Sequence, residues 1–145
     1  AVLGFAFKKN TGDTRESPAI LVCKYLLEEG AKLCIYDPKV PKQQIYTDLR
    51  SADRLDDERL IEVVDSPYKA TEGAHAMVFC TEWDEFLKLD FKRMYDQMLK
   101  PAFVFDGRKI VNVEELQSIG FHVETIGRRT SKPFKTRINR YISHD

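Results

Sequence analysis

The stretch AVLGFAFKKNTGDTRESPAILVCKYLLEEG, residues 1–30, decides the fold of this chain. Its first seven residues form an apolar run that is typical of a buried strand, and a polar loop follows. Ser17 can then cap a helix whose first position is Pro18, where a missing N–H costs nothing. Apolar residues recur at three-to-four spacing as far as Gly30, which favours the end of a helix. The stretch therefore predicts a strand, a loop and a helix, the opening of a βαβ unit.

The same alternation continues along the rest of the chain. Short apolar runs predict strands, and the amphipathic or capped segments between them predict single helices. Such an order implies right-handed crossovers and a mostly parallel sheet. We therefore expect an α/β fold, a Rossmann-like three-layer α/β/α sandwich of about six strands, in which strand 76–80 is covered on both faces. The expected strands are 1–7, 33–36, 60–64, 76–80, 102–105 and 121–126, and the expected helices are 18–29, 41–49, 67–73, 91–99 and 113–119.

The length of 145 residues is close to the modal size of one domain. Hydrophobic residues make up 43% and charged residues 32%, which is ordinary for a globular protein and too apolar for a disordered one. The longest apolar runs have about five residues, too short to span a bilayer, and there is no signal-peptide pattern. Cys23, Cys34 and Cys80 form no C-x-x-C pair, so we expect three buried packing residues in a reducing, cytoplasmic compartment.

The charges balance overall but are unevenly placed. The chain has 23 Lys and Arg against 23 Asp and Glu, yet its last nineteen residues hold six basic residues and one acid. A neutral chain with an acidic body does not favour binding of nucleic acid by the whole domain. The strand and helix pattern ends near Gly127, which predicts a domain over 1–127 and a basic tail over 128–145. Because the chain opens inside an apolar strand without Met, we interpret it as a piece of a longer protein.

Polar segments follow three of the expected strands, at the edge where open parallel sheets bind ligands. These segments are 7–15, 81–83 and 106–108. The first is not a G-x-G-x-x-G motif, because Ala6 occupies the second glycine position and lysines follow it. Lys8 and Lys9 still suit a phosphate through side-chain charge, although solvated loop lysines would have the same sequence. Arg108 follows a tight Asp-Gly step at the same edge, and a ligand-binding role and a surface role are both open for it.

Other polar and aromatic residues make weaker candidates. Asp37 stands where an NAD domain places its ribose-binding acid, but without the glycine motif we favour a turn-initiating Asp-Pro step. His75 and His122 have no serine or carboxylate at triad-like spacing, and we expect neither a hydrolytic nor a metal site. We interpret Trp83 and Phe86 as a cover for the edge of the core, with a platform for uracil as the alternative.

Six ordered motifs carry a resemblance to a known family. They are GFAFKKNTGDTRES (4–17), YDPKVP (36–41), GAHA (73–76), TEWD (81–84), FDGR (105–108) and IGF (119–121). Together they extend over about 1–127, and the first is long enough to be specific. The chain resembles the C-terminal, UDP-sugar-binding domain of the UDP-glucose/GDP-mannose dehydrogenase family.

The resemblance implies part of an enzyme that oxidises UDP-glucose to UDP-glucuronate in two NAD-dependent steps. By the family's pattern, Phe7, Lys8 and Arg108 contact the UDP-sugar, and Arg15 reaches NAD held by a separate N-terminal domain. The family's catalytic cysteine precedes the part matched here, so the resemblance implies no catalytic residue in this chain and no activity for it alone. It also implies a homo-oligomer, a hexamer in the family, with no nucleic-acid or membrane partner.

Two other classes of protein compete with this interpretation. One is a free-standing nucleotide sensor or interaction module on a Rossmann-like scaffold. The other is a receiver-like signalling domain, which needs clustered acids at the end of the first strand. Lys8 and Lys9 stand at that place and contradict it.

Overall fold

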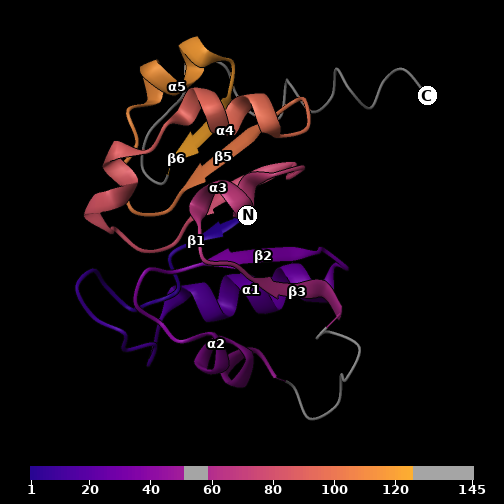
Figure 1. Ribbon diagram of the computed structural model, residues 1–145, viewed down its shortest axis with the longest axis vertical. Coiled ribbons are helices and arrows are strands. Elements are labelled where there is room, and N and C mark those ends of the chain that lie inside the picture. Colours follow the sequence, from indigo (N-terminus) through magenta and orange to yellow (C-terminus); the bar gives the residue numbers. More distant parts are fainter. Residues whose placement is uncertain (51–58, 126–145) are drawn as a thin grey trace.

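The computed structural model describes residues 1–50 and 59–125. They form one six-stranded sheet in the order β3-β2-β1-β4-β5-β6, and every strand pair is parallel. The α/β fold expected from the sequence is confirmed, with β1 at the centre of the sheet (Figure 1). The strands are β1 (Val2–Leu3), β2 (Leu33–Tyr36), β3 (Ile61–Val63), β4 (Ala76–Phe79), β5 (Phe103–Asp106) and β6 (His122–Thr125).

Two groups of helices enclose the sheet. α1 packs against α2, whereas α4 contacts both α3 and α5. Right-handed crossovers place the two groups on opposite faces of the sheet, because the connections run toward β3 in one half and toward β6 in the other. In Figure 1, α1 and α2 lie below, near β2 and β3, and α4 and α5 lie at the top. The helices are α1 (Pro18–Glu28), α2 (Lys42–Leu49), α3 (Pro67–Thr71), α4 (Phe91–Gln97) and α5 (Val113–Ile119).

The sequence signals at the ends of α1 and α5 are confirmed, whereas α3 and α4 each end two residues before the expected position. Ser17 is the N-cap of α1 and accepts a hydrogen bond from Ala19 N, with Pro18 at the first helical position. Gly120 ends α5 with a φ of 131°, a conformation that favours glycine. One element escaped the sequence analysis, a 3₁₀ helix, η2 (Asp84–Lys88), which has no side-chain cap. Residues 51–58 and the basic tail expected over 128–145 lie outside the described residues.

The first strand was expected over 1–7, which is wrong: β1 spans only Val2–Leu3, because Gly4 turns the chain out of the sheet. Gly4 has a φ of 92°, and a Cβ at this position would stand 2.5 Å from the Cβ of Thr81. Thr81 itself donates from its hydroxyl to Ala6 O at 2.8 Å. The segment after β1 therefore lies tightly against the segment after β4, which brings two of the three polar segments together.

Two expectations about burial are wrong. Met77 and Phe79 of β4 are fully buried, but Val78 between them is only half-buried. Cys34 is also half-buried, whereas Cys23 and Cys80 are buried as expected. Val78 is half-buried because α1, on its face of the sheet, contacts β2 and leaves cavities beside β4, which Val78 lines. Cys34 also lines one of these cavities.

Candidate functional site

The loop after β1 is closed by its own residues. Phe7 N donates to Asp13 O at 2.8 Å, and Arg15 donates to the Asp13 carboxylate from both its backbone N and its guanidinium. The hydrogen bonds from Arg15 lower the pKa of the Asp13 carboxyl to about 2. Thr14 is buried and donates to Asp48 of α2 at 2.6 Å. The loop is thus fixed at its base, while the side chain of Arg15 remains 88% exposed.

Asp37 is a structural residue at this edge. Its Oδ1 accepts from the backbone N–H groups of Lys39 and Val40, which forms the turn expected from the Asp-Pro step. Its Oδ2 accepts from Phe5 N and Ala6 N at 2.7 and 3.0 Å, and from an indole N–H at 3.1 Å. The turn interpretation is confirmed, and the same carboxylate also ties β2 to the loop after β1.

The indole that reaches Asp37 belongs to Trp83, the chain's single tryptophan. Trp83 is 9% exposed and Phe86 is 1% exposed, so both cover the edge of the core as expected. Phe86 also packs edge-on against Tyr36 and Phe79. Because neither ring offers a free face, the alternative of a stacking platform for uracil is not supported.

Asp106 and Gly107 form a turn that places Arg108 at the same edge of the sheet. The buried Asp106 carboxylate accepts from three backbone N–H groups, those of Arg108, Ile110 and Val111. The guanidinium of Arg108 then reaches across the edge, and its Nη2 donates to Phe7 O at 2.8 Å. Residues that lie a hundred positions apart in sequence therefore meet, as the sequence analysis expected.

The two lysines have different surroundings. Lys9 Nζ pairs with Asp84 at 3.1 Å, and Lys9 N donates to Glu82 Oε1 at 2.7 Å. Lys8 is exposed and has no hydrogen-bond or ion-pair partner within the part of the chain that the structure describes. Of the pair, Lys8 is therefore the cation that a ligand could engage without breaking an existing contact.

A small cavity adjoins Arg108 at the carboxyl ends of β4, β5 and β6. It has a volume of about 280 Å³ and lies against the first turns of α1, at Pro18 and Val22. Two buried side-chain atoms have no hydrogen-bond partner among the described residues, Arg108 Nε and Thr125 Oγ1. Both residues line this cavity, so it presents two polar groups that a ligand or solvent could satisfy.

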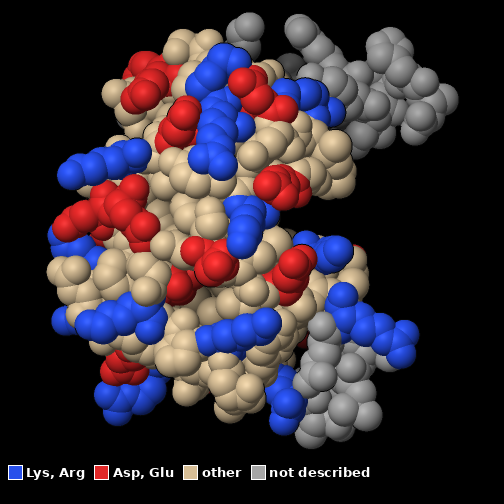
Figure 2. Space-filling model, viewed as in Figure 1, with Lys and Arg blue, Asp and Glu red and all other residues tan. Residues whose placement is uncertain are grey.

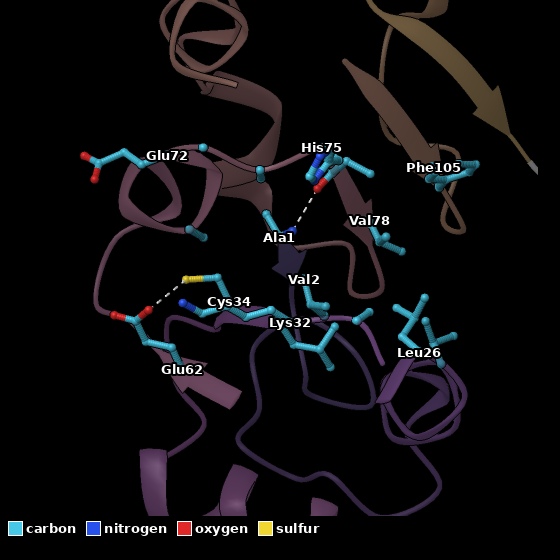
Figure 3. A pocket seen from close by; sticks show the side chains of 17 residues that line it. Ala1, Val2, Leu26, Lys32, Cys34, Glu62, Glu72, His75, Val78 and Phe105 are labelled. Carbon is cyan, nitrogen blue, oxygen red and sulfur yellow. Dashed lines mark hydrogen bonds between the residues drawn. The ribbon is translucent and has the colours of Figure 1, made fainter. Parts of the chain in front are cut away.

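A larger cavity of about 810 Å³ lies at the opposite edge of the sheet, where the strands begin. Figure 3 shows Ala1, Cys34, Glu62 and His75 around it, with the ammonium of Ala1 donating to a backbone oxygen, that of Ala76, at 2.8 Å. Burial lowers the pKa of this ammonium, and Cys34 Sγ lies 3.9 Å from Glu62 Oε2. None of the site residues expected from the sequence lines this cavity.

The cysteines have no features of nucleophiles. Burial raises the pKa of the Cys80 thiol to about 11, and it raises the pKa values of Cys23 and Cys34 as well. Within 1–50 and 59–125, no group of three or more His, Cys, Asp or Glu could hold a metal ion. No helix in these ranges is long and apolar enough to cross a bilayer. On the face seen in Figure 2, basic and acidic side chains are interspersed.

Glu82 is the residue that the sequence analysis missed. Its segment was noted as polar, but no role was given to its side chain. The carboxylate pairs with Arg108 Nη2 at 2.9 Å and also accepts from Lys9 N. The available signal was its place directly after a strand, at the same edge as three cations.

The parallel sheet with polar loops at the carboxyl ends of its strands places the chain in the class of Rossmann-like domains, which bind ligands at that edge. The model of the UDP-glucose/GDP-mannose dehydrogenase family, UDP binding domain, matches residues 1–113. The chain belongs to this family and is its UDP-binding domain. The matched residues include Phe7, Lys8 and Arg108.

Curated relatives agree with this assignment. The chain is 57% identical over 135 residues to the UDP-glucose 6-dehydrogenase of Drosophila melanogaster, and 51% identical over 141 residues to UDP-glucose 6-dehydrogenase 2 of Arabidopsis thaliana. These matches cover 89% and 88% of this chain but only 28% and 29% of the relatives. The chain therefore spans between a quarter and a third of the length of these relatives.

Solved structures of archaeal dehydrogenases have the same fold. The NDP-N-acetyl-D-galactosaminuronic acid dehydrogenase of Methanosarcina mazei superimposes with a TM-score of 0.72 at 24% identity, over 89% of this chain and 24% of that one. The UDP-D-ManNAc dehydrogenase of Pyrococcus horikoshii gives a TM-score of 0.61 at 29% identity, over 88% of this chain and 25% of that one.

Proposed function

We propose that this chain is the substrate-binding part of an NAD-dependent UDP-glucose 6-dehydrogenase, which oxidises UDP-glucose to UDP-glucuronate. Phe7, Lys8 and Arg108 bind the sugar nucleotide. The observation that carries the proposal is the junction of Arg108 Nη2 with Phe7 O at 2.8 Å, beside the unpaired Lys8. Two cations at one strand-end edge suit a diphosphate, and the guanidinium adds donors with a fixed geometry.

The NAD of the reaction does not fit this domain's own edge. A ribose hydroxyl would need a free acceptor on Asp37, but five N–H groups already donate to that carboxylate. The segment after β1 also carries lysines in place of the glycines that let a pyrophosphate approach the backbone. NAD is therefore held mainly by another part of the enzyme, with the exposed Arg15 reaching toward it, and the 145-residue chain alone does not reduce NAD.

The family suggests the oligomeric state, partners and compartment that we expect for the enzyme. We expect a homo-oligomer, a hexamer, with UDP-glucose and UDP-glucuronate as its small-molecule partners and no nucleic-acid or membrane partner. Three free cysteines support a reducing, cytoplasmic compartment.

Titration of UDP into the protein, followed by calorimetry, tests the proposed site. Lys8→Ala should weaken UDP binding roughly tenfold to a hundredfold, the worth of a charge-assisted contact of about 1.5–3 kcal/mol. Lys24→Ala, which removes an exposed lysine of α1, is the matched control and should leave the affinity unchanged. Equal affinities for wild type and Lys8→Ala would place Lys8 in solvent and contradict the site.

A further inference from the structure

Glu82 connects three loops that come from distant parts of the chain. Its Oε1 accepts from Lys9 N at 2.7 Å in the loop after β1, and its Oε2 forms an ion pair with Arg108 Nη2, 2.9 Å away, in the loop after β5. Glu82 itself belongs to the loop after β4. A single carboxylate therefore sets the distance between the two loops that carry the proposed UDP-binding cations.

The contacts of Arg108 are divided between its nitrogen atoms. Nη2 donates to Phe7 O at 2.8 Å and lies in an ion pair with Glu82 Oε2 at 2.9 Å. Nη1 has no acceptor within the described residues, and Nε is buried without a partner. Because Nη2 is held by Phe7 O and by the charge of Glu82, one end of the guanidinium is anchored to the protein while its other nitrogens stay available.

An acid at this place needs an explanation, since the proposed ligand is a dianion. Repulsion between Glu82 and a diphosphate disfavours binding if the charge acts alone. The side chain is also only 31% exposed, so the pair with Arg108 is screened less than a surface ion pair. If Glu82 supports ligand binding, the affinity gained by orienting Arg108 must therefore exceed the affinity lost through repulsion between Glu82 and the diphosphate.

We propose that Glu82 is a positioning residue for the sugar nucleotide, which acts by orienting Arg108 and by holding the loop of Lys8 and Lys9 through Lys9 N. The inference rests on the proposed function, because it assigns a role to Glu82 in that same site. It predicts that removal of a negative charge weakens the binding of an anion. A pure charge effect predicts instead that removal of this charge strengthens the binding of an anion.

The test uses the complete dehydrogenase that contains this domain and measures the Kd for UDP by calorimetry and KM for UDP-glucose and for NAD. Glu82→Gln keeps the size of the side chain and removes its charge. Asp84→Asn is the matched control, because it removes the same charge two residues away from a 69% exposed side chain that contacts Lys9 Nζ and not Arg108. A double-mutant cycle with Arg108→Ala measures whether the two residues act together.

We expect Glu82→Gln to raise the Kd for UDP and the KM for UDP-glucose roughly tenfold, with the KM for NAD within about twofold of wild type. Asp84→Asn should leave all three values unchanged or slightly lower. In the Arg108→Ala background, Glu82→Gln should have little further effect on UDP. Glu82→Asp keeps the charge but cannot span both donors, so it should fall between wild type and Glu82→Gln, and it carries the test if Glu82→Gln unfolds.

Three outcomes would overturn the inference. If Glu82→Gln binds UDP as tightly as wild type or more tightly, Glu82 acts only as a charge. If the loss of UDP affinity in Glu82→Gln is fully additive with the loss in Arg108→Ala, Glu82 does not act through Arg108. If the wild-type enzyme does not bind UDP, the proposed function fails and the role of Glu82 fails with it. If only the role of Glu82 is wrong, Lys8→Ala and Arg108→Ala still weaken UDP binding.

Discussion

Asp37→Asn separates the two roles that an acid at this position could have. In the structure, Oδ2 accepts from two backbone N–H groups and from Trp83 Nε1, and Oδ1 accepts from two more backbone N–H groups. An asparagine keeps one acceptor oxygen and places an amide donor where the other oxygen was. Either two or three N–H groups then lose their acceptor.

The magnitude follows from this count. A buried donor without an acceptor costs roughly 1–3 kcal/mol, and Phe5 and Ala6, which supply two of the five, are fully buried. We expect Asp37→Asn to lower the free energy of unfolding by about 3–5 kcal/mol, a large share of the 5–15 kcal/mol of a typical domain. The exposed Asp65, which pairs with Lys69, is the matched control, and Asp65→Asn should leave the free energy of unfolding essentially unchanged.

Urea unfolding followed by tryptophan fluorescence measures this loss directly. Trp83 is the only tryptophan and contacts Asp37, so its emission reports on the affected region. A value within about 1 kcal/mol of wild type, together with weaker nucleotide binding, would refute the structural role. Asp37 would then be the ribose-binding acid that the geometry argues against.

Three further outcomes are expected from unfolding experiments. Gly4→Ala should cost about 2–4 kcal/mol, because its Cβ would stand 2.5 Å from Thr81 Cβ at a φ of 92°. A loss below about 1 kcal/mol would mean that Thr81 moves aside. Thr125→Val should change stability by less than about 1 kcal/mol, since Oγ1 has no partner among the described residues, and a larger loss would reveal one. Stability should fall as pH rises from about 9 to 11, because the unfolded chain loses the Cys80 proton near 9 while burial holds the folded pKa at about 11. Cys80→Ala should make the urea midpoint less steeply dependent on pH in this range, and an unchanged slope would contradict the assignment.

Most of the fold could be predicted because its signals are local. Ser17 and Pro18 start α1 through capping and a fixed φ, and Gly120 ends α5 through a positive φ, so each boundary depends on the residues beside it. The parallel sheet then follows from the alternation of strands with single helices. The meeting of Phe7 and Arg108 was also predictable, since strand ends converge at one edge.

The parts that could not be predicted depend on long-range packing. The apolar run at β4 indicated two covered faces, but whether a helix reaches Val78 depends on where α1 crosses the sheet. Likewise, Lys8 and Lys9 are equivalent in sequence, and only the positions of Glu82 and Asp84 show that Lys9 is engaged and Lys8 is not. A residue's type predicts what it can do, whereas its partners become visible only in three dimensions.

The acids of the edge are held by the protein's own donors. Asp37 accepts from five N–H groups, Asp106 accepts from three, and Glu82 accepts from Lys9 N and pairs with Arg108. Their oxygens are turned toward the protein's own donors, so the groups left for a ligand are Lys8 and the remaining N–H groups of Arg108. A count of charges in the sequence therefore does not show which groups a ligand meets at this edge. It follows that neutralising one of these acids should weaken the binding of a diphosphate, because the loops that carry the cations lose their support.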